Sequence, residues 1–127
     1  MRLILVRHAE AAPGEPDESR PLTPEGRDVA RELAGRLAAE RPDAVLSSPL
    51  LRARETADAI AAAAGLEAEA DARLAPGAAV DDVRAAVAGR GATVVAVGHA
   101  PDLPNAVRAL TGEEVRFRPG ASFEVEL

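Results

Sequence analysis

The chain contains at residues 93–99 the sequence TVVAVGH, an unbroken apolar run that ends in Gly98 and His99. Apolar and polar residues do not alternate in this run. Because helices cover a parallel sheet on both faces, its strands are apolar without interruption. Residues 93–97 therefore predict a strand buried on both faces, with His99 just beyond its carboxyl end.

Two other apolar runs end in a similar way. Residues 2–6 read RLILV and are followed by Arg7 and His8. Residues 44–46 read AVL and are followed by Ser47, Ser48 and Pro49. Both runs predict strands of the same sheet.

A helix is predicted after the first strand and a loop over residues 10–22. Thr23 is expected to be its N-cap, with Pro24 in the first turn. Val29, Leu33 and Leu37 recur every four residues and are expected to form its buried face.

The remaining elements follow from the same signals. Ser48 and Pro49 have the form of a second cap and first-turn proline. The further predictions are a helix over 49–64, a weak edge strand over 67–72, a helix around 80–87, a helix over 102–110, and one or two strands over 114–127 broken at 119–120. Strands that alternate with helices predict crossover connections. We therefore expect an α/β fold: a single domain over residues 1–127, with three α/β/α layers and a mainly parallel central sheet.

Composition limits the possible functions. The 127 residues carry a formal net charge of −6, which disfavours nucleic acid as a partner. The absence of cysteine excludes a thiolate nucleophile. The apolar start is too short for a signal peptide, and no run reaches the length of a membrane span. We expect a cytoplasmic protein with no membrane partner.

Both histidines of the chain lie at predicted strand ends, where parallel sheets bind ligands. If the strands are parallel, His8 and His99 meet Arg7 and also Arg52, which lies near the start of the helix over 49–64. Arginines and a helix N-terminus favour a bound anion, above all phosphate. The sequence therefore predicts a phosphate site at this edge of the sheet.

A metal site built from the same histidines is the alternative. His8 and His99 with a carboxylate from Glu10 or Asp102 would form a two-histidine, one-carboxylate set. Arg7 and Arg52 would then lie beside the cation, and no metal-ligand spacing is present. We expect no metal and no cofactor.

At these residues the sequence resembles the histidine phosphatase superfamily, which has the phosphoglycerate mutase-like fold. The resemblance lies in three motifs and spans nearly the whole chain: LVRHA at residues 5–9, SPLLRARET at 48–56, and VGH at 97–99. Within the superfamily the chain is most similar to the short SixA-like phosphohistidine phosphatases, whose Arg-Pro-Leu-Thr element corresponds to residues 20–23.

Two positions depart from the family pattern. Ala9 replaces the glycine of the signature, a change that related short proteins share. Pro76 stands where larger members carry an acid. Expelling an alkoxide needs a proton donor, whereas the imidazole of phosphohistidine is a less basic leaving group. The substitution at Pro76 therefore disfavours mutase and phosphomonoesterase activity.

The resemblance implies a metal-independent phosphatase in which His8 is phosphorylated and water then hydrolyses the intermediate. Arg7, Arg52 and His99 would surround the phosphoryl group, with Arg20 and Ser48 as further substrate contacts. The implied substrate is a protein that carries phosphohistidine. A phosphatase for small phosphate esters and a non-catalytic phosphate-binding module remain as alternatives.

Overall fold

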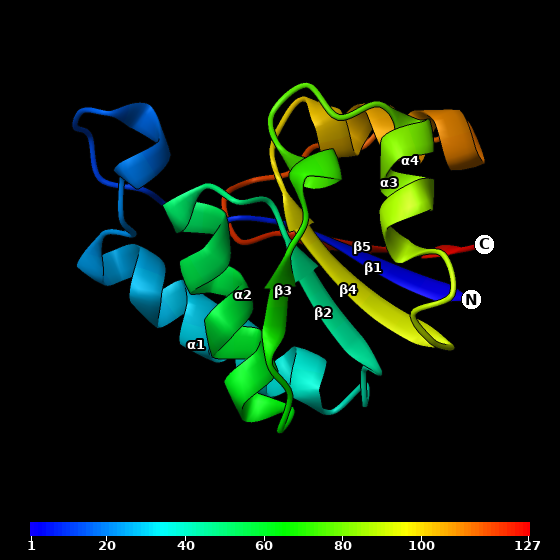
Figure 1. Cartoon of the computed structure of the whole chain (residues 1–127), viewed down its shortest axis with the longest axis horizontal. Helices are drawn as coiled ribbons and strands as arrows, with labels where there is room; N and C mark the ends of the chain where they lie inside the picture. The colour runs from blue at the N-terminus through cyan, green and yellow to red at the C-terminus, as the bar shows by residue number, and fades with distance from the viewer.

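Five strands form one sheet in the order β3-β2-β4-β1-β5 (Figure 1). The computed structural model describes residues 1–127. The strands are β1 (Arg2–Arg7), β2 (Ala44–Ser47), β3 (Ala68–Ala70), β4 (Thr93–Gly98) and β5 (Ser122–Glu126). All pairings are parallel except that of β1 with β5 at one edge. β4 lies between β2 and β1, so the strand predicted from residues 93–97 is central.

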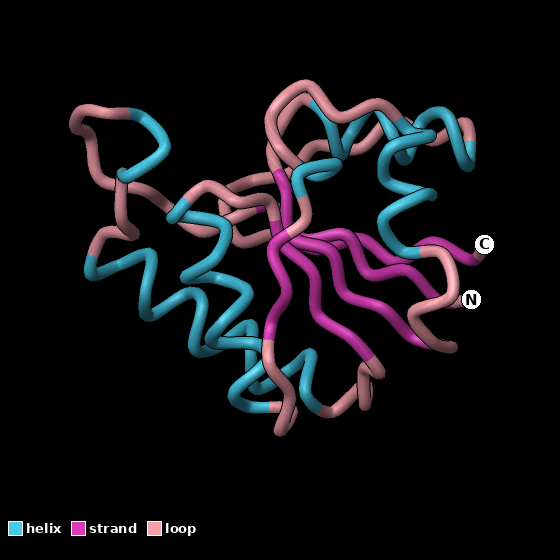
Figure 2. The backbone as a smooth tube through the Cα atoms, viewed as in Figure 1, coloured by secondary structure: helices cyan, strands magenta, loops and turns pink.

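Helices cover both faces of this sheet (Figure 1, Figure 2). The first face packs against α1 (Pro24–Ala38) and α2 (Leu51–Ala63), and the second against α3 (Val80–Val87) and α4 (Asp102–Thr111). Two 3-10 helices, η1 (Asp17–Ser19) and η2 (Ala72–Leu74), lie in the connections. The predicted three-layer α/β/α architecture is confirmed. None of the helices has the length and apolar character needed to cross a membrane.

The inner strands are buried on both faces because successive side chains point to opposite sides of the sheet. On one face, Ile4, Val6, Val95 and Val97 pack with α1 and α2. On the other, Leu3, Leu5, Val94 and Ala96 pack with α3 and α4. Both faces thus require apolar residues, which explains why β1 and β4 show no alternation.

The buried face of α1 differs from the prediction at Val29, which is 41% exposed. The residues that face the core are Gly26, Ala30, Leu33, Ala34 and Leu37. From Ala30 onward they follow the i, i+3, i+4, i+7 spacing of an amphipathic helix. The prediction followed the larger side chain of Val29, whereas the core accepts the smaller alanines beside it.

The two predicted helix caps have different outcomes. Thr23 caps α1, since its Oγ1 accepts the N–H of Gly26 at 2.9 Å. Ser48 does not cap α2, because its Oγ accepts the N–H of Leu50 at 3.2 Å and α2 begins only at Leu51. Such a serine turn competes with helix formation. The start predicted at Pro49 is therefore wrong by two residues.

The C-terminal tail forms one strand, β5, which follows a turn at the predicted residues 119–120, and no strand precedes that turn within the tail. Gly120 has a positive φ of 83°, a conformation that glycine adopts without steric cost. Its N–H donates to the carbonyls of Arg7 at 3.0 Å and His8 at 3.1 Å. This turn therefore braces the residues that follow β1.

Candidate active site

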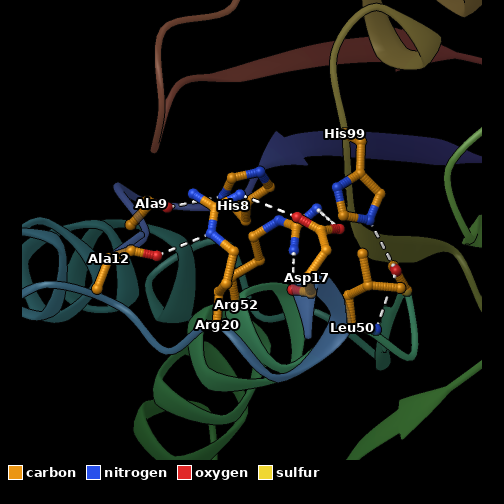
Figure 3. A network of polar contacts seen from close by, with 9 residues as sticks. His8, Ala9, Ala12, Asp17, Arg20, Leu50, Arg52 and His99 are labelled. Carbon is orange, nitrogen blue, oxygen red and sulfur yellow. Dashed lines mark hydrogen bonds and ion pairs between the residues drawn. The ribbon is translucent and has the colours of Figure 1, made fainter. Parts of the chain in front are cut away.

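The two histidines come together at the carboxyl ends of β1 and β4, as predicted (Figure 3). The backbone N–H of His8 donates to the carbonyl of Gly98 at 3.1 Å, which extends the strand pairing by one residue. The two imidazole rings lie 5.2 Å apart between centroids, at an interplanar angle of 57°. Both rings are nearly buried, with 9% of His8 and 4% of His99 exposed.

The hydrogen bond of His8 selects one form of its ring. Nδ1 lies 2.7 Å from the carbonyl oxygen of Ala9. Because a carbonyl only accepts, Nδ1 carries the proton, and the neutral ring keeps the lone pair on Nε2. Burial lowers the pKa of His8, and the positive charges of Arg52, Arg7 and Arg20 lower it further. The ring is thus a neutral base with Nε2 available for attack.

The ring of His99 is held by Ser48. Nε2 lies 2.7 Å from the Ser48 hydroxyl, which leaves Nδ1 on the side of His8 and Asp17 (Figure 3). Burial, followed by the nearby His8 and Arg52, lowers the pKa of His99 to about 4. His99 is therefore neutral near pH 7. Ser48, predicted as a substrate contact, lies at the site as a partner of His99.

Arg7 contributes an unpartnered buried donor. Its Nη1 donates to the carbonyl of Phe117 at 2.8 Å, which fixes the guanidinium against the segment that precedes β5. Its Nε is buried and has no hydrogen-bond partner. A buried N–H without a partner carries a free-energy cost that an anion accepting its hydrogen would remove.

Arg52 lies on the first turn of α2 and is only 8% exposed. Its Nη1 donates to the backbone carbonyl of Asp17 at 2.9 Å, and its Nη2 donates to the Asp17 carboxylate at 3.2 Å. The guanidinium thus has a fixed position beside the histidines (Figure 3). Arg20 reaches the same carboxylate, with Nη1 3.0 Å from Asp17 Oδ1, while its Nε donates to the carbonyl of Ala12.

The carboxylates of the alternative metal set do not gather with the histidines. Glu10 accepts a hydrogen bond from the hydroxyl of Thr23, and Asp102 accepts one from the backbone N–H of Gly77. No group of three or more His, Cys, Asp or Glu side chains comes together in a metal-binding arrangement. The donor set that does gather, two histidines and three arginines, fits an anion better than a cation.

Two residues of the site were missed in the sequence. Thr56 is fully buried, and its Oγ1 accepts the N–H of Ala9 at 3.1 Å and donates to the carbonyl of Arg52 at 2.9 Å. Its place in the motif at residues 48–56 was a usable signal. Asp17, which contacts Arg20 and Arg52, lies in a polar loop with no pattern to distinguish it from Glu18.

The comparison with protein families gives one match, the histidine phosphatase superfamily (branch 1), over residues 3–76. The chain belongs to this superfamily. The matched segment includes Arg7, His8 and Arg52, whereas His99 lies outside it, at the carboxyl end of β4. The resemblance inferred from the three motifs is confirmed. As a histidine phosphatase, the protein is a hydrolase that removes phosphoryl groups from its substrate.

Solved structures agree with the family. The protein histidine phosphatase SixA in complex with tungstate is 31% identical, with a TM-score of 0.88, and covers 100% of this chain and 88% of its own. A protein assigned as the phosphohistidine phosphatase SixA of Agrobacterium tumefaciens is 32% identical, with a TM-score of 0.75 and coverage of 88% and 77%. A search of curated protein sequences gave no match. The phosphoglycerate mutase-like fold predicted for this histidine phosphatase is confirmed.

Proposed function

We propose that this histidine phosphatase hydrolyses phosphohistidine on a protein through a phosphorylated His8. The observation that carries the proposal is the neutral His8 ring with its Nε2 lone pair free, beside His99 and the arginines. The SixA structures at 31% and 32% identity support phosphohistidine as the substrate, and the bound tungstate of the first supports a phosphate site.

In the first step, Nε2 of His8 attacks phosphorus and the bond between phosphorus and the substrate imidazole breaks. When the substrate ring carries a proton on its other nitrogen, it leaves as neutral imidazole and needs no further proton. His8 becomes a phosphorylated imidazolium whose Nδ1 keeps its proton and donates it to the carbonyl of Ala9 at 2.7 Å. The reaction moves a phosphoryl group between two like nitrogens, so no strong general acid is required.

In the second step, water attacks phosphorus and the bond to His8 Nε2 breaks. The products are neutral His8 and dihydrogen phosphate, which accounts for both protons of the water. Arg7 and Arg52 would stabilise the charge of the transferring group in both steps, since fixed cationic donors in a buried site need no reorganisation. His99, with Nδ1 facing the same space, would donate a further hydrogen bond (Figure 3).

Pro76 favours phosphohistidine over phosphate esters. It lies in the exposed connection between η2 and α3 and has no group that could protonate an alkoxide. The neighbouring carboxylate of Asp102 is engaged by the N–H of Gly77 at 2.9 Å. An ester substrate would therefore have to lose its leaving group without a proton donor from this segment.

The test is an assay of a phosphorylated histidine-carrier domain beside a phosphate monoester. We expect turnover of the carrier, little turnover of the ester, and full activity in EDTA. Rapid quench with excess substrate should trap acid-labile, alkali-stable phosphate on the enzyme, and His8→Ala should lose both the label and the turnover. A label on His99, or a preference for the ester, would contradict the proposal.

A further inference from the structure

The carboxylate of Asp17 bridges the two arginines that face the histidines. Oδ1 accepts from Arg20 Nη1 at 3.0 Å, and Oδ2 accepts from Arg52 Nη2 at 3.2 Å. In Figure 3 this carboxylate lies between Arg52 and His99 and faces the space beside His8. Its two oxygens meet these guanidinium groups in the way that two oxygens of a phosphoryl group would.

The two sides of this contact differ in how firmly they are held. Arg52 is buried on α2 and is also fixed by the backbone carbonyl of Asp17 at 2.9 Å. The Asp17 side chain is 59% exposed and lies on the short η1 turn. Water therefore solvates a displaced carboxylate well, and the ion pair itself is worth little at such exposure. A phosphoryl dianion, with more charge and more acceptor oxygens, can displace it.

In the empty site the carboxylate is charged near neutral pH. Hydrogen bonds from Arg20 and then Arg52 hold the pKa of Asp17 below its ordinary value. A bound phosphoryl group would therefore meet a negative charge unless the carboxylate moved away. The same contact satisfies guanidinium N–H groups that would otherwise face the empty site.

We propose that Asp17 is an internal competitor of the phosphoryl group, which occupies the anion position of Arg52 and Arg20 in the free enzyme and weakens the binding of free phosphate. The proposal rests on the proposed function, because it takes Arg52 as a phosphoryl contact. Its consequence is rapid release of the product phosphate. Substrates that bind through further contacts of their protein part would overcome the competition, whereas inorganic phosphate would not.

The experiment measures the dissociation constants of inorganic phosphate and tungstate, by calorimetry and by the imidazole NMR signals. Asp17→Asn keeps the shape and removes the charge, and Asp17→Ala removes the side chain but leaves the carbonyl on Arg52. We expect both variants to bind either anion about 10-fold more tightly, equivalent to about 1.4 kcal/mol. Glu18→Gln is the control, since it removes the same charge from the same turn and should leave both constants unchanged.

Each result has one meaning. Weaker or unchanged anion binding in both Asp17 variants would overturn the proposal, and weaker binding would show that Asp17 positions the arginines instead. Tighter binding in Glu18→Gln by the same factor would also overturn it, because net charge alone would then explain the effect. Arg52→Ala reports separately on the proposed function: if it leaves anion binding intact, the phosphoryl site is placed wrongly.

Discussion

Each imidazole of the site has one nitrogen occupied and one free. The carbonyl of Ala9 occupies Nδ1 of His8, and the Ser48 hydroxyl occupies Nε2 of His99. Because the occupied nitrogens differ, the free ones are Nε2 of His8 and Nδ1 of His99. Under the proposed function, a nucleophile and a hydrogen-bond donor can thus face one phosphoryl group from two rings of the same residue type.

The pKa values of both rings are the first testable consequence. Burial, followed by the arginine charges for His8 and by His8 and Arg52 for His99, lowers both pKa values. NMR titration of the free enzyme should place His8 below the ordinary value of about 6.5 and His99 at about 4. Bound phosphate should raise both, since an anion favours imidazolium.

Assignment of the titration is simple because the chain has only these two histidines. His99→Gln leaves the signals of His8 alone. A free-enzyme pKa of His8 clearly above 6.5 would contradict the placement of Arg7 and Arg52 beside it.

Arg52 should matter far more than another arginine of the same helix. We expect Arg52→Ala to lower kcat by about 10²-fold or more, the usual loss when one donor to the transition state is removed. Arg54 is the matched control, since it is exposed two residues further along α2 and forms no ion pair. If Arg52→Ala and Arg54→Ala lower kcat equally, Arg52 is not a phosphoryl contact.

His8, His99 and Ser48 were predicted from the sequence because they follow strand ends. Their positions depend on only two facts, the parallel direction of the strands and the placement of ligands at the carboxyl ends. Asp17 could not be found in this way, because its contact with Arg52 joins a loop to a helix 35 residues away. Nothing in the local sequence specifies how such a loop folds back.

At the scale of elements, α2 connects Arg52 to the loop that holds His8. Thr56 lies one turn after Arg52, and its hydroxyl bridges the Arg52 carbonyl and the Ala9 N–H. The Ala9 carbonyl in turn holds His8 Nδ1. The tautomer of His8 therefore depends on where α2 packs.

Thr56→Val tests this dependence. Valine has the same shape but leaves the buried N–H of Ala9 without a partner, so we expect a loss of about 1–3 kcal/mol in the free energy of unfolding. We also expect a lower kcat, whereas Thr56→Ser should retain both. Urea unfolding and steady-state kinetics measure the two effects.

Thr111→Val is the control for Thr56→Val. Its hydroxyl makes the same kind of pair, with Val107 and Glu113, at the exposed end of α4. We expect it to change stability by less than about 0.5 kcal/mol and kcat not at all. Equal effects of the two valine substitutions would show that the contact of Thr56 with Ala9 does not position His8.

The elements were predicted well where hydrophobic period and caps agreed, as for α1 after Thr23. The prediction failed where a polar side chain had two possible partners. The hydroxyl of Ser48 bonds with Leu50 and His99, which lies 51 residues away, and α2 begins later in consequence. The exposure of Val29 likewise depends on how α1 packs against the other elements. The sequence of one helix does not indicate that packing.

At the scale of the whole molecule, the layer order followed from the sequence but the strand order did not. The uninterrupted apolar runs of β1 and β4 required helices on both faces, and the sheet has them. The antiparallel direction of β5 and the position of its preceding segment next to Arg7 come from long-range contacts, such as the bond from Arg7 to the carbonyl of Phe117. Such contacts leave no periodic signal in the chain.

The same burial that makes the histidines neutral should make the whole molecule less stable in mild acid. The folded pKa of His99 is about 4, whereas the unfolded value is about 6.5. Between these values the unfolded chain binds more protons, so the free energy of unfolding rises with pH and falls as the solution is acidified. His8, whose pKa is also lowered, acts in the same direction.

From pH 7.5 to pH 5, His99 alone should reduce the free energy of unfolding by about 2 kcal/mol. The lowered pKa values of Asp17, Asp71 and Glu124 contribute mainly below this window, because carboxyl groups titrate near pH 4 even when unfolded. Urea unfolding at several pH values should show this loss, and His99→Gln should remove most of it. Equal stability of the wild-type protein at pH 7.5 and 5 would mean that His99 accepts a proton in the folded state as readily as in the unfolded chain. His99 would then be protonated in mild acid, and it would face a bound phosphoryl group as a cation.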